Sequence, residues 1–169
     1  MLKNPIIFLT AILVLLVVAC SENPTNPNNE RVEAGENYTF ILSAKQAENA
    51  ENNRSELISD PFLIDDVRIE IVDDTKLMFI EVTQELGCAE SHPDKFQVIW
   101  DGIMLMIYPP QVAFYLTFNS DVCTEVNEGV QETIVLDLHK HVGDYGESAQ
   151  YTVINASKSA EDNDIKISR

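Results

Sequence analysis

Positive charge is what this sequence has least of. It contains 11 Lys and Arg against 28 Asp and Glu, which gives a formal net charge of −17. Nucleic-acid binders gain affinity from clustered Lys and Arg that neutralise phosphates, so this composition argues against nucleic acid as a partner. The densest acidic pairs, Asp65-Asp66 and Asp73-Asp74, are scattered along the chain rather than joined in one block. That distribution is typical of a solvated exterior.

The motifs of the common enzyme classes are also missing. The chain has no CxxC, GxSxG, HExxH, phosphate-binding loop or EF-hand spacing. Its paired carboxylates fall at the ends of apolar segments, where acids commonly cap turns, whereas a glycosidase needs two carboxylates facing each other across a cleft. We therefore expect no catalytic residues, no cofactor and no enzymatic activity.

The chain has a single long apolar run, Ile6 to Val18, which follows Lys3. This run of 13 residues is shorter than the roughly 20 that a membrane-spanning helix needs, and the order of charge then apolar run is that of a signal peptide. The end of this run together with the two residues after it, Val17-Val18-Ala19-Cys20, resembles the lipobox of bacterial lipoproteins. The resemblance implies that residues 1–19 are a lipoprotein signal peptide and that Cys20 carries diacylglycerol and a further acyl chain such as palmitate.

The lipobox resemblance also implies a place in the cell envelope. Ser21 stands where enterobacterial lipoproteins retained at the inner membrane have Asp, which favours the outer membrane, on either its periplasmic or its surface-exposed face. Residues 20–35 are rich in Asn, Pro and Glu and offer little to bury, so they indicate a flexible tether. We expect one domain over residues 36–156 and a frayed C-terminal tail over residues 157–169.

The domain shows an apolar period of two, which indicates strands. Eight segments are expected to be strands: 37–44, 65–74, 75–86, 95–100, 103–108, 111–118, 132–138 and 149–156. Asp101-Gly102 predicts a type I′ hairpin turn between the fourth and fifth segments. Residues 43–57 are polar on all sides and favour a long loop with a helical turn. The pattern predicts an all-β, immunoglobulin-like antiparallel β-sandwich of about 7–8 strands, with a small β-barrel as the alternative.

Two cysteines remain besides Cys20. Cys88 and Cys123 each follow an apolar strand segment, and an oxidising compartment favours a disulfide between them. The alternative is a copper or zinc site formed by Cys88 with His92. His139 and His141 lie apart from both cysteines in the sequence, with no Met in their neighbourhood, so they do not indicate a copper site. No metal site is therefore predicted, with Cys88 and His92 as the alternative candidates.

A second resemblance covers residues 65–155. The pattern GC…H…F.V.WDG…PPQVAFYLTF…D.C…ETIVLDL is similar to uncharacterised β-sandwich lipoproteins of Bacteroidota. The resemblance implies the fold and the cysteine pair but no mechanism. We expect Met104 and Met106 to share one face of a strand as core or groove lining. Tyr108, Tyr115 and Tyr145 are candidates for a peptide or carbohydrate surface.

The sequence thus predicts a lipid-anchored, non-enzymatic binding or assembly module of the cell envelope. Its expected partners are the membrane, through Cys20, and a protein or glycan ligand. Two alternatives stay open: a copper- or zinc-handling protein, and a protein-binding module that acts like a protease inhibitor.

Overall fold

The computed structural model describes residues 30–52, 54, 59–144, 148–158 and 163–167. In this part of the chain there are nine strands and two α-helices. The strands are β1 (Arg31–Ala34), β2 (Tyr38–Leu42), β3 (Phe62–Val72), β4 (Thr75–Gly87), β5 (Phe96–Trp100), β6 (Gln111–Phe118), β7 (Asn127–Asp137), β8 (Gln150–Asn155) and β9 (Ile165–Ile167). The helices are α2 (Ala44–Asn52) and α3 (Leu138–Val142), and a 3-10 turn, η2, spans Ser120–Val122.

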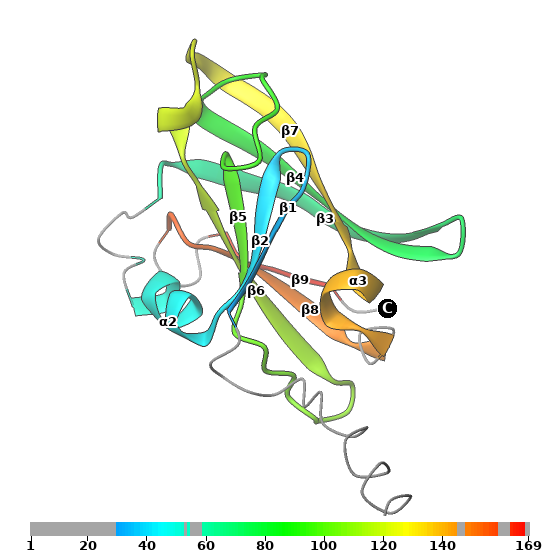
Figure 1. The fold of residues 1–169 in the computed structure, drawn as a ribbon. Helices are drawn as coiled ribbons and strands as arrows, with labels where there is room; N and C mark the ends of the chain where they lie inside the picture. Colours follow the sequence, from blue (N-terminus) through cyan, green and yellow to red (C-terminus); the bar gives the residue numbers. More distant parts are fainter. Residues whose placement is uncertain (1–29, 53, 55–58, 145–147, 159–162, 168–169) are drawn as a thin grey trace, which may run out of the picture.

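The strands form two sheets that pack face to face (Figure 1). One sheet has six strands in the order β1-β2-β5-β6-β8-β9, and the other has three in the order β3-β4-β7. The predicted all-β sandwich is therefore confirmed, and the alternative of a closed barrel is not what the chain forms. None of the helices in the described residues is long and apolar enough to cross a membrane.

Two strand pairs differ from the predicted antiparallel arrangement. β2 pairs with β5, and β6 pairs with β8, in parallel register. The chain between the members of each pair passes through the three-stranded sheet, β3 and β4 in the first case and β7 in the second. Long crossovers of this kind allow parallel pairing, which a tight hairpin does not. The periodicity of single strands carries no information about such crossovers.

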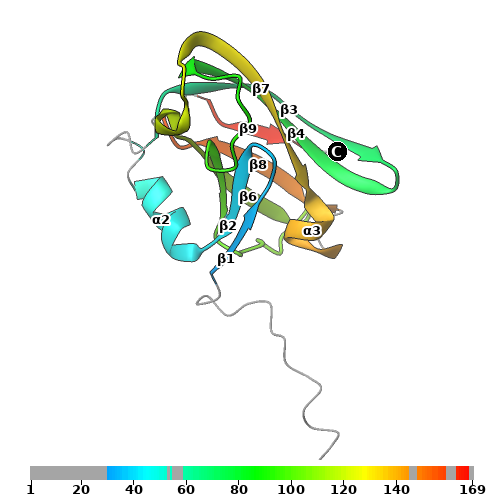
Figure 2. The same ribbon diagram turned by 45° about the horizontal axis from the view of Figure 1, so that its top comes forward.

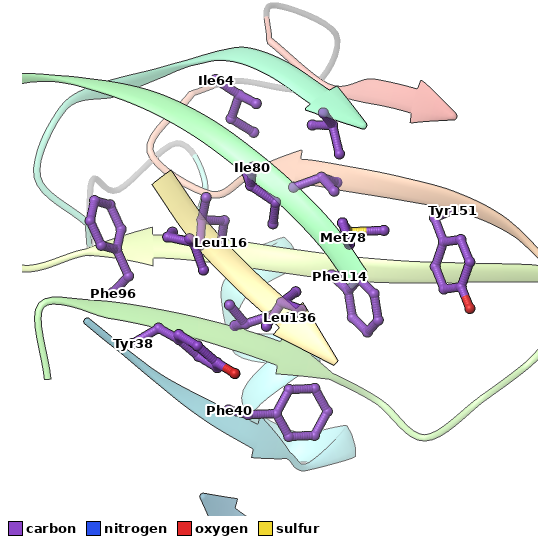
Figure 3. Close-up of a cluster of buried hydrophobic side chains, with 14 of the residues drawn as sticks. Tyr38, Phe40, Ile64, Met78, Ile80, Phe96, Phe114, Leu116, Leu136 and Tyr151 are labelled. Carbon is purple, nitrogen blue, oxygen red and sulfur yellow. The ribbon is translucent and has the colours of Figure 1, made fainter. Parts of the chain in front are cut away.

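The core fills the space between the two sheets. Met78 and Ile80 of β4 and Leu136 of β7 face Phe114 and Leu116 of β6 (Figure 3), and each is at most 1 % exposed. These residues alternate with exposed ones along each strand, because successive side chains point to opposite faces of a sheet. Burial of apolar surface stabilises the fold by roughly 25 cal/mol per Å².

A tight hairpin joins β3 to β4. Val72 pairs with Thr75, and the two residues between them, Asp73 and Asp74, have φ of 49° and 62°. Two central residues with positive φ define the type I′ turn that matches the twist of the flanking strands. The chain therefore turns tightly at Asp73-Asp74, and the tip of this hairpin projects beyond the body of the sandwich (Figure 1).

The hairpin predicted at Asp101-Gly102 is wrong. Of these two residues only Gly102 has a positive φ, 80°, and residues 103–108 do not form a strand. β5 already has β2 along one edge and β6 along the other, so the sheet has no free edge beside β5 for a returning strand. Residues 101–110 instead form a loop between β5 and β6.

Two segments are helical where a long loop and the connection after segment 132–138 were predicted. α2 covers residues expected to be mostly loop, and it buries Ala47 and Ala50 against Ile41 and Ile99 of the six-stranded sheet. α3 contains His139. Asp137 caps its start, because the Asp137 side chain accepts a hydrogen bond from the Lys140 N–H. Small alanines and a capping aspartate were the local signals for these two helices.

The sheet also extends beyond the predicted domain limits of residues 36 and 156. β1 lies within the segment expected to be a tether and pairs with β2. β9 lies within the expected tail and pairs with β8. Asp164 accepts a hydrogen bond from the buried Arg54 guanidinium at 2.8 Å and another from the backbone N–H of Asn155 at 3.1 Å. The expectation of a frayed tail is therefore wrong for residues 163–167.

Candidate functional site

Cys88 and Cys123 are joined by a disulfide, as predicted. Their Cα atoms lie 5.6 Å apart and 35 residues apart in sequence. The bond ties the end of β4 to the segment that follows η2. Since the sulfur of Cys88 is bonded to Cys123, no thiolate faces His92 while the disulfide is intact.

His92 lies in the loop between Cys88 and β5. Its Nδ1 accepts a hydrogen bond from the backbone N–H of Asp94 at 3.1 Å, and its side chain is 45 % exposed. The imidazole therefore shapes a local turn. Within the described residues there is no group of three or more His, Cys, Asp or Glu side chains that could hold a metal ion.

His139 and His141 lie on α3, and their environments differ. The His139 side chain is exposed and its Nδ1 lies 3.4 Å from Asp144. His141 is buried, stacks on the Phe40 ring at a centroid distance of 4.0 Å, and has its Nε2 3.3 Å from the Tyr38 hydroxyl. The two imidazoles do not share a site.

Burial controls the charge of His141. Loss of solvent lowers the pKa of His141 to about 4, although Glu33, whose carboxylate lies 3.6 Å from Nδ1, partly opposes the shift. The hydrogen bond from Lys140 to Glu33 lowers the pKa of that carboxyl group. At neutral pH His141 is therefore an uncharged core residue beside a charged Glu33.

An open groove lies at the disulfide end of the sandwich, where the β1–β2 turn faces β7. It has a volume of about 430 Å³. Its lining is mostly polar and consists of Gly35, Glu36, Asn37, Tyr38, Ala89, Ser91, Gln131, Glu132, Thr133 and Val135. We call this cavity the groove. It brings together three segments that are far apart in sequence: 35–38, 89–91 and 131–135.

The floor of the groove is a buried polar network centred on Glu132. Lys95, which has no exposed surface, places its ammonium group 2.5 Å from one Glu132 oxygen and donates to the carbonyl oxygens of Cys88 and Glu90. Asn37 donates to the other Glu132 oxygen at 2.7 Å and to the Thr133 carbonyl at 3.1 Å. The network connects the β1–β2 turn, the disulfide loop and β7, so the walls of the groove are held in place without a ligand.

The sequence did not reveal this groove. The sequence predicts Lys95 and Glu132 only as the first residues of the strand segments 95–100 and 132–138. The one available signal was a lysine directly before the apolar run of β5 in a chain with little positive charge. A buried lysine needs a charged or polar partner, but which acidic residue supplies it depends on the pairing of the sheets.

A second unusual surface lies at the other end of the sandwich. Most side chains of residues 103–108, here called the apolar loop, are exposed: Ile103 56 %, Leu105 54 %, Met106 75 %, Ile107 55 %, and Tyr108 fully. Met104 packs partly against the core, so Met104 and Met106 do not share a face. Large apolar patches that face solvent commonly mark binding surfaces.

The remaining candidate residues are not brought together. Tyr115 is half-buried and packs against the cluster beneath α2, whereas Tyr108 of the apolar loop is fully exposed. Tyr145, Cys20 and the signal peptide of residues 1–19 lie outside the described residues. No known protein family, curated protein or solved structure matches this chain.

Proposed function

We propose that this chain is a lipid-anchored protein of the bacterial outer membrane that works as a non-enzymatic binding module. The lipobox-like residues ending at Cys20 support the anchor. The proposed binding role rests on a single observation, the groove. The ligand that suits this groove is a segment of a protein or a glycan.

The chemistry of the groove favours a neutral or cationic ligand. Glu36 and Glu132 contribute carboxylates to its lining, and no Lys or Arg is among its lining residues. Asn37, Gln131 and Thr133 add amide and hydroxyl groups that can donate or accept hydrogen bonds. A net charge of −17 adds a field that repels anions. Lysine-containing peptides and neutral sugars both fit these requirements.

Two features support a role in binding rather than catalysis. The residues that line the groove include no His and no Cys, so Ser91 has no imidazole base beside it. Glu132 is committed to hydrogen bonds with Lys95, Asn37 and Gln84. These hydrogen bonds fix the position of the Glu132 carboxylate as part of the shape of the groove.

The alternative of a copper- or zinc-handling protein has weak support. It relied on Cys88 and His92, and the sulfur of Cys88 is in a disulfide while His92 Nδ1 is occupied by a backbone N–H. Soft metals would therefore find one imidazole nitrogen at this position. A single such ligand is far short of the three or four that zinc sites use.

The groove is tested by blocking it. Thr133→Arg adds a long cationic side chain to the groove, whereas Glu128→Arg places the same side chain at an exposed position of β7 that is not among the lining residues. We expect purified full-length protein to bind lysine-containing peptides or neutral oligosaccharides on an array, and Thr133→Arg to lose that binding while Glu128→Arg keeps it. Equal binding by the two variants would show that the groove is not the ligand site.

The anchor is tested separately. In bacteria grown with a labelled fatty acid, the wild-type chain should incorporate the label at Cys20 and fractionate with the outer membrane. Cys20→Ala should incorporate none. A labelled Cys20→Ala chain, or an unlabelled wild type, would contradict the proposed lipid anchor and leave the groove proposal to its own test.

A further inference from the structure

The apolar loop has a fixed shape. Leu105 and Gln111 exchange two backbone hydrogen bonds, at 2.9 and 3.0 Å, which close the loop around its tip. On the other side, the Ile103 N–H donates to the Asp101 carboxylate at 2.7 Å and the Trp100 indole N–H donates to the Ile103 carbonyl at 3.2 Å. The exposure of Met106 and Ile107 is therefore held by the fold itself and does not come from fraying.

The strand register places this loop at the end of the sandwich where the chain enters. Arg31 pairs with Leu42, and Leu42 pairs with Trp100, so the first residue of β1 and the last residue of β5 lie at one end of the six-stranded sheet. The loop leaves the sheet directly after Trp100. Figures 1 and 2 agree in showing the start of β1 and the loop between β5 and β6 at the same end.

The groove lies at the opposite end of the same sheet. Tyr38 of its lining pairs with Phe96, the first residue of β5. A strand such as β5 therefore runs from the groove at its start to the apolar loop at its end. Because the loop and the groove lie at opposite ends, a surface that contacts the apolar loop leaves the groove facing away from that surface.

We propose that the apolar loop inserts into the same membrane leaflet that holds the lipid anchor, as a second contact between the chain and the membrane. The inference rests on the anchor proposed above. Residues 21–30 separate Cys20 from β1, and ten extended residues span at most about 35 Å, so the anchor keeps this end of the sandwich close to the bilayer. The loop is then the apolar surface nearest to the lipid.

The size and composition of the loop suit lipid better than a protein partner. A stable protein interface uses roughly 20–30 residues on each side, whereas this exposed apolar surface is a single loop of six residues. Its side chains are aliphatic except for one tyrosine at position 108, the type of residue found at the membrane interface. Penetration by about 5–10 Å, the depth reached by interfacial segments, is within reach of such a tip.

Acidic charge leaves apolar insertion as the main attraction between the domain and the bilayer. With a net charge of −17, the chain is repelled by anionic headgroups, so electrostatic attraction cannot bring the sandwich to the surface. Burial of Leu105, Met106 and Ile107 in lipid supplies the attraction that charge does not. The two contacts together orient the domain so that the groove faces away from the membrane.

The test measures contact between the loop and lipid in the full-length protein. Met106→Trp places a tryptophan at the loop tip, and Val126→Trp places one at an exposed position near the disulfide end. Both are reconstituted in phosphatidylcholine vesicles that contain lipids brominated near the headgroup. We expect several-fold stronger quenching for Met106→Trp than for Val126→Trp, after subtraction of the signal of the native Trp100.

A second variant keeps the result interpretable. Adding Leu105→Asp and Ile107→Asp to Met106→Trp should reduce the quenching to the level of Val126→Trp, because each lost apolar contact weakens partition about tenfold. Both positions are exposed, so a near-ultraviolet circular dichroism spectrum equal to that of Met106→Trp alone is the check for an intact fold.

Three outcomes overturn the proposal in distinguishable ways. Equal quenching of Met106→Trp and Val126→Trp in protein that floats with the vesicles would leave the anchor in place and refute insertion of the loop. A Met106→Trp emission that shifts to the blue with protein concentration, without quenching by lipid, would show that a second copy covers the loop. Failure of the wild type to float with vesicles would refute the anchor and, with it, this inference.

Discussion

Lys95 and Glu132 form an ion pair, 2.5 Å from nitrogen to oxygen, beneath the groove, and Lys95 is fully buried. They lie on different sheets, since Lys95 directly precedes β5 of the six-stranded sheet and Glu132 belongs to β7 of the three-stranded sheet. The pair therefore joins the two layers of the sandwich at one end. The hydrogen bonds that Lys95 donates to the Cys88 and Glu90 carbonyls also hold the loop that carries the disulfide.

Removal of the lysine charge should be strongly destabilising. Lys95→Met leaves the Glu132 carboxylate without its cation, and breaking a buried pair in this way costs about 3–5 kcal/mol of unfolding free energy. The double variant Lys95→Met with Glu132→Gln should recover part of the loss, because no buried charge is left unpaired. Urea unfolding measures both, with Lys166→Met, at an exposed position of β9, as the control. A loss for Lys95→Met no larger than that of the control would refute the role of the pair.

The disulfide should be complete and stabilising. Chemical titration of the denatured, unreduced protein is expected to find no free thiol at positions 88 and 123. Replacing both cysteines by serine frees a loop of 35 residues, for which the chain-entropy relation gives a loss of about 4 kcal/mol. Thermal and urea unfolding of the double variant measure this loss. Two reactive thiols in the wild type would contradict the assignment.

His141 should make the fold sensitive to mild acid. The imidazole takes up a proton near pH 6.5 when unfolded but only near pH 4 when folded, because it is buried against Phe40. Between these values the unfolded chain binds more protons, so stability falls as the pH is lowered from 6.5 to 4, by up to about 3 kcal/mol. Glu33, whose pKa is lowered, contributes stability at neutral pH that is lost in the same direction at lower pH.

The variant His141→Phe isolates this effect. A phenyl ring preserves the stacking on Phe40 and cannot be protonated, so the slope of stability between pH 6.5 and 4 should become shallower. His139→Phe is the matched control, because the His139 side chain is exposed on the same helix. Urea unfolding at four or five pH values measures the slopes. Parallel curves for wild type and His141→Phe would mean that His141 does not carry the acid sensitivity.

The C-terminal segment should be needed for stability. Asp164→Ala removes the carboxylate that pairs with the buried Arg54 guanidinium and accepts from Asn155. We expect a loss of about 1.5–3 kcal/mol together with faster proteolysis after Asn155, since the buried Arg54 guanidinium loses its charged hydrogen bonds to Asp164. Lys166→Ala, an exposed change on β9, should have little effect on either measurement. Similar proteolysis of both variants would show that Asp164 does not fasten the segment.

Strand positions could be read from the sequence wherever one face of a strand is buried and the other is not. Val67 of β3 and Met78 of β4 occupy buried positions that the period of two predicts, and the Asp73-Asp74 turn between their strands follows from local backbone chemistry. Residues 103–108 are an exception to this relation between sequence pattern and strand. They have the composition of a strand, but apolar composition alone does not distinguish a buried strand from a loop that presents its side chains to lipid or solvent.

Contacts between residues that are far apart in sequence could not be predicted from the strand periodicity. The cysteine pair was predictable because the expected lipid anchor at Cys20 leaves two cysteines, which allow one pairing. Many acidic residues in the sequence could pair with Lys95, and nothing in the local sequence marks Glu132 as its partner. The helical position of His141 was missed because a strand and a short helix both tolerate the residues that follow Asp137.

By itself the sequence determined an acidic all-β domain after an apolar leader with a lipobox-like end, together with its single internal disulfide. These properties depend on composition, on local periodicity and on counting. Only the tertiary structure decided that β2 and β5 run parallel, that Lys95 meets Glu132, and that the apolar loop and the groove lie at opposite ends. The reason is physical: these relationships depend on which strands share a sheet edge, and strand pairing is a long-range choice that a period of two leaves open.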